Sequence, residues 1–274
     1  MKQRNYRVAI VILNYLNYLD TIECVESINK NGYDLCGIII VDNGSGNDSY
    51  NKLKQELGGQ QNVHILKAKK NYGYARGNNI GIRYATKRMN ADFVLVANND
   101  TIFLEKDYVE KLLSVYKKGI GVIGSEIILK NGVKQNVMEE HLGLKDTFFS
   151  FINAWSYDRG ASFDFPTMSG KTEKVLHGCA ILFTPSFFEH YRGFYKRTFL
   201  YREEAILKLM CKCKKLRQVY VPDAKIFHKE DQSSEMSFDN DIRIMTKYSN
   251  KSQKYVFWWS LKYFVKVIVI RHTV

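Results

Sequence analysis

Three short runs of apolar, largely β-branched residues lie in the first hundred positions of the chain, at 8–13, 38–41 and 93–96. Helix-like stretches at 18–29 and 79–88 separate them, so the predicted order is β-α-β-(β)-α-β, with the bracketed strand optional. Strands this uniformly apolar are covered on both faces. The pattern therefore predicts an α/β fold with a mainly parallel sheet between layers of helices.

The second half of the chain is less regular. Residues 135–174 are polar and aromatic with few clear periods, and we expect them to carry loops over the sheet. Periodicity then returns. The predicted elements are a strand at 175–184 interrupted by Gly178, a helix at 201–213, and short strands at 218–221 and 224–227, the last ending on His228.

Each apolar run of the first half ends abruptly on polar side chains. These are Asn14, then Asp42 and Asn43, then Asn98, Asn99 and Asp100. Turn formation alone would explain Asp42 and Asn43. In open α/β sheets, however, ligands bind beyond the carboxyl ends of the strands. Three polar strand ends in one sheet therefore favour a binding site.

The segment KNYGYARGNNIGIRYA, residues 70–85, has glycines at 73, 77 and 81 before a predicted helix. It matches neither the Walker A motif nor the dinucleotide fingerprint. Glycines allow close backbone approach, and Arg76 places a cation near the helix N-terminus. This setting suits a nucleotide or its diphosphate.

Among the 274 residues, lysine and arginine exceed aspartate and glutamate by 13 charges, which indicates an anionic partner. The candidates are nucleic acid, a phosphorylated small molecule or a membrane surface. No recognised nucleic-acid-binding motif is present, so we expect no nucleic-acid partner. The five scattered cysteines include no C-x-x-C pair, and the N-terminus lacks a cleavage site. Both features favour a cytoplasmic protein without a disulfide framework.

Seven motifs, in this order and spacing, resemble those of the family 2 glycosyltransferases with the GT-A fold. They are ILNY (12–15), IIIVDNGS (38–45), NYGYARGNN (71–79), VANNDT (96–101), HGCAILF (177–183), FLYREEAIL (199–207) and PDAKIFHKEDQSS (222–234). The resemblance covers about residues 6–234. It implies a Rossmann-like, mainly parallel central sheet flanked by helices. It also implies a domain at 1–240, with a nucleotide-sugar half at about 1–101 and an acceptor and catalytic half at about 102–240.

The resemblance implies a nucleoside-diphosphate sugar as donor, with UDP or dTDP favoured over GDP. Asp42 would contact the nucleotide base. The other implied donor-binding residues are Asn14, Asn43, Asn71, Arg76, Asn78, Asn98 and Asn99.

The resemblance also implies a divalent metal. The family's D-x-D motif is degenerate here, NND, so only Asp100 can be an anionic ligand. His228 corresponds to the second protein ligand. Oxygen ligands suit Mg²⁺ or Mn²⁺, and an imidazole favours Mn²⁺. Without the motif, a histidine at a strand end is more often an ordinary surface residue.

In the resembling family an acidic pair supplies the general base, and Glu204 takes that role here with Glu203 as the alternative. Adjacent residues of a helix point about 100° apart, so at most one faces a given site. Acids are also favoured at a helix start by its dipole, which is the structural alternative. Gly178 would leave room for sugar or acceptor. The implied reaction is an inverting transfer to a hydroxyl of a cell-surface glycan or lipid-linked oligosaccharide.

Residues 241–274 are predicted to form a basic amphipathic helix. Within 251–270, the lysines at 251, 254, 262 and 266 fall in an arc of about 120°, and they leave too short an apolar run to span a bilayer. The helix could lie on anionic lipid at the inner face of the cell membrane, or pack on the catalytic domain or a partner subunit.

Two other functions fit parts of the pattern. A nucleotidyltransferase would need a glycine-rich loop with a lysine after the first strand, and ILNYLNYLD has none. A nucleotide-binding homologue without activity would explain the degenerate NND and the Glu-Glu pair.

Overall fold

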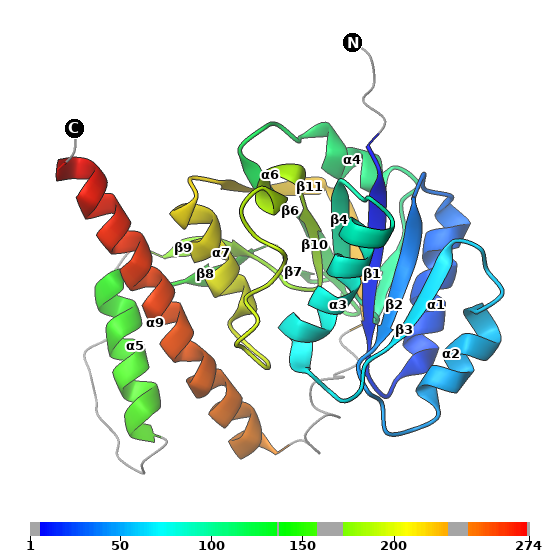
Figure 1. Cartoon of the computed structure of the whole chain (residues 1–274), viewed down its shortest axis with the longest axis horizontal. Coiled ribbons are helices and arrows are strands. Elements are labelled where there is room, and N and C mark those ends of the chain that lie inside the picture. The colour runs from blue at the N-terminus through cyan, green and yellow to red at the C-terminus, as the bar shows by residue number, and fades with distance from the viewer. Residues whose placement is uncertain (1–5, 136, 158–171, 230–240, 273–274) are drawn as a thin grey trace.

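The computed structural model describes residues 6–135, 137–157, 172–229 and 241–272. Residues 158–171 of the irregular region and 230–234 of the histidine motif lie outside them. In the described residues, a nine-stranded sheet has the order β3-β2-β1-β4-β10-β6-β11-β5, with β7 paired to β6 (Figure 1). A second sheet pairs β8 with β9.

The first half of the chain alternates strands and helices. Its elements are β1 (Val8–Asn14), α1 (Tyr18–Asn31), β2 (Gly37–Asp42), α2 (Ser49–Leu57), β3 (Val63–Lys67), α3 (Gly73–Arg88), β4 (Phe93–Asn98) and β5 (Thr101–Phe103). Strands β3, β2, β1 and β4 are parallel neighbours, which confirms the predicted mainly parallel sheet. The optional strand is β3, and α2 was not predicted.

The second half completes the same sheet. Its elements are α4 (Tyr108–Ser114), β6 (Ile120–Leu129), β7 (Lys134–Gln135), β8 (Val137–Glu140), α5 (Leu144–Tyr157), β9 (Glu173–Leu176), β10 (Ala180–Phe183), α6 (Pro185–Phe188), α7 (Glu203–Cys213), β11 (Arg217–His228) and α9 (Ile242–His272).

Three regions of the second half differ from the prediction. Residues 135–174, where periodicity predicted none, contain β8 and α5. The single strand predicted at 175–184 is two strands, β9 and β10, which belong to different sheets. The two short strands before His228 are one strand, β11, whose register is interrupted between Val221 and Lys225.

The uniform burial of the central strands has a simple geometric cause. In β1, Val8, Ile10 and Ile12 pack in the core cluster that includes α1 and α2. The alternate residues Ala9 and Val11 pack in the other cluster, which includes α3. Successive side chains of a strand point to opposite faces, so helices on both faces require every position to be apolar.

Two glycines of the 70–85 segment serve helix packing. A Cβ at Gly81 would come 2.4 Å from Val11 Cγ1, and one at Gly77 would come 2.6 Å from Leu13 Cδ1. Their missing side chains let α3 lie close against β1. Helix α3 begins at Gly73, six residues before the predicted start at residue 79. The prediction missed this first part because glycines have no side chain and so obscure an amphipathic pattern.

The long C-terminal helix α9 packs beside α5 and α7 (Figure 1). It buries Ser252, Val256, Trp259 and Ser260, and the hydroxyls of Ser252 and Ser260 donate to the carbonyls of Leu200 and Leu142. Its inner face therefore packs on the preceding α/β domain, which is one of the predicted alternatives. Among the described residues, none of the helices has the length and apolar character that crossing a membrane requires.

Candidate active site

The parallel register of β1 and β2 places Asn14 beside Asp42, and both are fully buried. Asn14 Nδ2 donates to Asp42 Oδ1 at 2.9 Å, while Thr21 Oγ1 donates to Asn14 Oδ1, also at 2.9 Å. The backbone N–H of Ser45 donates to Asp42 Oδ2 at 3.2 Å. Asn14 therefore fixes the orientation of the Asp42 carboxylate at the end of its strand.

A pair of asparagines joins the end of β2 to the start of α3. Asn43 Nδ2 donates to Asn71 Oδ1 at 3.0 Å, and Asn43 Oδ1 accepts from the Tyr72 backbone N–H at 3.1 Å. Gly73 follows with φ of 78°, and a Cβ there would come 2.1 Å from the Phe199 carbonyl oxygen. The asparagines thus hold a loop that packs directly on the residues before α7.

Two of the predicted donor-binding residues, Arg76 and Asn78, do not line the cavity next to this loop. Asn78 is buried, and its Nδ2 donates to the Tyr74 carbonyl within α3 at 3.1 Å. Arg76 is exposed, and its guanidinium lies 5.2 Å from the centre of the Tyr72 ring. Neither side chain lines the cavity described below.

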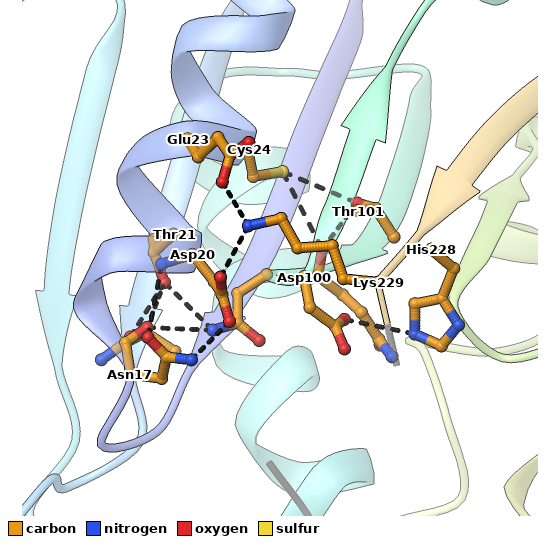
Figure 2. A network of polar contacts seen from close by, with 12 residues as sticks. Asn17, Asp20, Thr21, Glu23, Cys24, Asp100, Thr101, His228 and Lys229 are labelled. Atoms are coloured by element: carbon orange, nitrogen blue, oxygen red, sulfur yellow. Dashed lines mark hydrogen bonds and ion pairs between the residues drawn. The ribbon is translucent and has the colours of Figure 1, made fainter. Parts of the chain in front are cut away.

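Asp100 and His228, the two predicted metal ligands, lie side by side (Figure 2). Antiparallel pairing of β5 with β11 sets His228 opposite Thr101, and Asp100 Oδ1 lies 3.2 Å from His228 Nε2. Both residues are buried. Asp100 Oδ1 and both ring nitrogens of His228 have no hydrogen-bond partner among the described residues. Buried polar atoms without partners are rare, so these atoms fit a divalent cation.

The described residues contain no cluster of three or more acidic, histidine or cysteine side chains that could hold a metal. Asp100 and His228 would therefore supply only part of a coordination shell. A cation such as Mn²⁺ or Mg²⁺ would take its remaining ligands from water and from diphosphate oxygens.

Lys229 anchors this corner to α1 (Figure 2). Its backbone N–H donates to the Asp100 carbonyl at 2.9 Å, and its Nζ lies 2.8 Å from Asp20 Oδ1 and also pairs with Glu23. Burial lowers the pKa of Lys229, but the hydrogen bonds and charges of Asp20 and Glu23 outweigh it and raise that pKa. The ammonium is therefore a permanent link between β11 and α1.

The two glutamates at the start of α7 have different surroundings. Glu203 is 5% exposed, and its Oε1 has no hydrogen-bond partner among the described residues. Burial, together with the charge of Glu204, raises the pKa of Glu203 well above its usual range. Glu204 points toward Gly178, where an added Cβ would come 2.3 Å from its Oε1. Burial also raises the pKa of Glu204, although Arg202 and backbone hydrogen bonds oppose the shift.

A cavity of about 490 Å³ lies at the carboxyl ends of β1 and β4, within the size range of ligand sites, roughly 300–1,000 Å³. The predicted residues that line it are Asn43, Asn71, Asn98, Asn99, Gly178, Glu203 and Glu204. The other buried members, Asn14, Asp42, Asp100 and His228, are not in its lining. Asn99 connects the cavity lining to the buried Asn14. It lines the cavity, and its Nδ2 donates at 3.3 Å to Thr21 Oγ1, which itself donates to Asn14 Oδ1.

Sequence reasoning missed His177 and Tyr74, which also line the cavity. The His177 ring lies 5.9 Å from that of His228. Burial, with the charge of His228, lowers the pKa of His177 to about 4. Tyr74 donates its hydroxyl to the Gly178 carbonyl at 2.6 Å. In the sequence, the one indication of a role for His177 was its position directly before Gly178.

Glu140 and Arg202 were missed as well. Arg202 Nη1 lies 3.0 Å from both carboxylate oxygens of Glu140, and both residues line the cavity. Arg202 and Tyr201 have left-handed backbone conformations, with φ of 67° and 69°. The ion pair holds this unfavourable turn immediately before α7. No sequence signal marks Glu140, since its strand lies in the irregular region.

Comparison with known proteins identifies the family and the fold of the chain. The family model described as glycosyl transferase family 2 matches residues 8–190. The chain belongs to glycosyl transferase family 2. A relative from Haloferax volcanii, the low-salt glycan biosynthesis hexosyltransferase Agl10, is 25% identical over 203 residues, which cover 72% of this chain and 59% of the relative. The chain therefore spans less than two thirds of that relative's length.

Two solved structures confirm the GT-A fold of this chain. The mannosyltransferase PcManGT from Pyrobaculum calidifontis, in complex with GDP-Man and Mn²⁺, has a TM-score of 0.58 and 13% identity, covering 98% of this chain and 76% of that one. GalNAc-T7 with UDP, GalNAc and Mn²⁺ has a TM-score of 0.61 and 12% identity, covering 83% of this chain and 44% of that one.

We expect Gly178→Ala to impair glycosyl transfer without unfolding the protein. The new methyl group would meet only the flexible end of the Glu204 side chain and would displace its carboxylate. A misplacement of about 1 Å can cost about a hundredfold in rate. The measurement is nucleoside-diphosphate release, with the melting temperature. Gly59→Ala, which meets nothing within 4 Å, is the matched control. Full activity in Gly178→Ala would show that the Glu204 position is not critical.

We expect Glu203→Gln to become more stable than the wild type as pH rises. A raised carboxyl pKa contributes stability below the unfolded pKa, and that stability is lost as pH rises toward the folded pKa. Glutamine does not titrate, so the difference in unfolding free energy should grow by up to about 1.4 kcal/mol per pH unit above pH ~5. Urea unfolding from pH 5 to 9 measures it, with exposed Glu56→Gln as the control. A difference that does not change with pH would contradict the burial argument.

Proposed function

We propose that this glycosyltransferase moves a sugar, with inversion, from a nucleoside-diphosphate donor to a hydroxyl of a cell-surface glycan or lipid-linked oligosaccharide, using a divalent metal. The observation that carries the proposal is one cavity bordered by the Glu204 carboxylate, with polar strand ends and the Asp100–His228 pair close by. The relative's name, a hexosyltransferase of glycan biosynthesis, supports the substrate class.

In the proposed reaction, Glu204 accepts the proton of the acceptor hydroxyl. That oxygen then attacks the anomeric carbon on the face opposite the diphosphate, and the carbon–oxygen bond to the diphosphate breaks. A single displacement inverts the anomeric centre. Burial raises the pKa of Glu204, which makes its carboxylate a stronger base.

Asp100 and His228 would hold the metal. When bound, Mn²⁺ or Mg²⁺ neutralises charge that develops on the departing diphosphate. The names of the structural neighbours, which include Mn²⁺ with GDP-Man or with UDP, support a metal and a nucleotide sugar here. For the base we propose UDP or dTDP rather than GDP. Residues 1–101 would form the donor half and residues 102–240 the acceptor half.

Ligand-dependent thermal unfolding tests this proposal. The melting temperature of the wild type is measured with UDP, with dTDP and with GDP, each in the presence and absence of Mn²⁺. We expect UDP or dTDP to stabilise the protein only with metal, by about 2.7 kcal/mol at a hundred times the dissociation constant.

Two variants make the result specific. Asp100→Asn should abolish the metal-dependent shift, whereas Asp223→Asn, at an exposed position of β11, should retain it. If no nucleoside diphosphate stabilises the wild type, the donor site does not exist as proposed. Binding without turnover of any sugar nucleotide would instead indicate an inactive homologue.

We also propose that the outer face of α9 contacts anionic lipid at the inner face of the cell membrane. In its C-terminal half, α9 exposes the apolar side chains Trp258, Phe264, Val265, Ile268 and Val269, and the exposed apolar side chains of α5 include Phe148 and Trp155. Lys251, Lys262 and Lys266 are exposed on α9 among them. Clustered exposed apolar residues mark an interaction surface, and interspersed lysines favour anionic headgroups.

Vesicle cosedimentation tests the lipid contact. Wild type should sediment with vesicles that contain phosphatidylglycerol and much less with pure phosphatidylcholine. The double variant Trp258→Glu, Val265→Glu should lose most of this binding, because it places two charges on the exposed face. Leu104→Glu, at an apolar residue that is 57% exposed elsewhere, is the control. Equal sedimentation of both variants would contradict the assignment of this face to lipid.

A further inference from the structure

A second cavity, of about 320 Å³, lies between α5 and α9. It shares Arg202 and Ser249 with the cavity that Glu204 borders, so the two cavities adjoin. Arg202 directly precedes Glu203 and Glu204, and its left-handed backbone is held by the ion pair with Glu140. A molecule in the second cavity would therefore extend toward the catalytic carboxylate.

The lining of the second cavity is rich in neutral hydrogen-bonding groups. Besides Ser249, these residues are Ser150 and Asn153 from α5, and Thr246, Asn250 and Gln253 from α9. Gln253 is buried, with 7% of its surface exposed. Tyr157 adds an aromatic side chain at the end of α5. Amides and hydroxyls offer both donors and acceptors, which is what a ligand with many hydroxyl groups requires.

Charge argues against an anionic or purely apolar occupant. Among the described residues that line this cavity, none is acidic and Arg202 is the one cation. Glu140 lies 3.0 Å from Arg202 Nη1 and neutralises it. A phosphate group would meet little net positive charge here. A hydrocarbon chain would lie against the buried amide of Gln253, and contact between a buried polar group and an apolar ligand is costly.

We infer that the cavity between α5 and α9 is the subsite for a saccharide acceptor, whose attacking hydroxyl reaches Glu204 in the adjoining cavity. This inference rests on the proposed function and deepens it, because it places the sugar of the acceptor between α5 and α9. Helix α9 lies beyond residues 8–190, which the family model matches. The α9 side of the subsite therefore lies outside the matched region, whereas the α5 side lies within it.

The geometry also separates the two roles of α9. On the helix, Thr246, Asn250 and Gln253 follow the spacing of one face. Trp258 and Val265, which the lipid test changes, lie about 90–115° from the centre of that face. Phe264 and Ile268 lie on the same side as Thr246 and Asn250, but at least three turns further along the helix than Gln253. A saccharide in the cavity and a lipid on the outer face would not compete for the same side chains.

The test uses the double variant Asn153→Ala, Thr246→Val in the full chain. Asn153 is exposed and Thr246 is partly buried, and valine keeps the shape of threonine, so the fold should tolerate both changes. The probes are p-nitrophenyl glycosides of glucose, galactose, mannose, N-acetylglucosamine and rhamnose. Saturation-transfer NMR measures their binding with UDP and Mg²⁺ present, because Mg²⁺ is diamagnetic, and steady-state kinetics with the sugar nucleotide and Mn²⁺ measures transfer. Asn51→Ala, at an exposed asparagine of α2, is the matched control.

We expect wild type to bind at least one glycoside. The double variant should raise its acceptor KM or dissociation constant about tenfold, through lost hydrogen bonds. The kcat, the hydrolysis of the donor by water and the thermal shift with UDP and Mn²⁺ should change less than about twofold. These donor-side readouts distinguish a lost acceptor contact from damage to the active site.

Three results would overturn the inference while the donor-side readouts stay intact. They are no glycoside binding to wild type, an unchanged acceptor KM in the double variant, or transfer to a polyprenyl phosphate that carries no sugar with equal efficiency in both proteins. Failure of the donor readouts in wild type would instead refute the proposed function.

Discussion

The antiparallel pairing of β5 with β11 is the interaction on which the candidate active site depends. It joins residues more than a hundred positions apart, because His228 lies opposite Thr101 and the Lys229 N–H donates to the Asp100 carbonyl. The Lys229 side chain then binds Asp20 and Glu23 on α1 (Figure 2). Without this pairing, the Asp100 carboxylate and the His228 imidazole would not meet, and neither would fit a metal alone.

Burial gives three neighbouring acids different properties. Asp100 keeps an unpartnered oxygen beside His228, which suits a cation. Glu203 is buried, and its burial together with the charge of Glu204 raises the pKa of its carboxyl group well above the usual range. Glu204, one residue further along α7, reaches the cavity beside Gly178, where the proposed reaction requires a base. The helix separates two adjacent, identical residues because each faces a different direction.

Helix α9 links the catalytic domain to its proposed surroundings. One face packs on α5 and α7 and buries Val256 and Trp259. A second face lines the cavity that adjoins the active site, through Thr246 and Gln253. A third face exposes Trp258 and Val265. The same helix would therefore place the catalytic cavity near a membrane and bind the acceptor's sugar portion, which is a consistent arrangement for an acceptor attached to lipid.

The sequence by itself determined the parallel sheet, because helices on both faces require uniformly apolar strands, and it marked the strand ends where Asn14, Asp42 and Asp100 lie. Its motifs also indicated the family. Only the tertiary structure shows that Glu204 lies beside Gly178, that His177 and the Glu140–Arg202 pair border the cavity, and that α5 packs on α9. These features arise from contacts between distant segments, whereas periodicity and motif spacing record only local geometry.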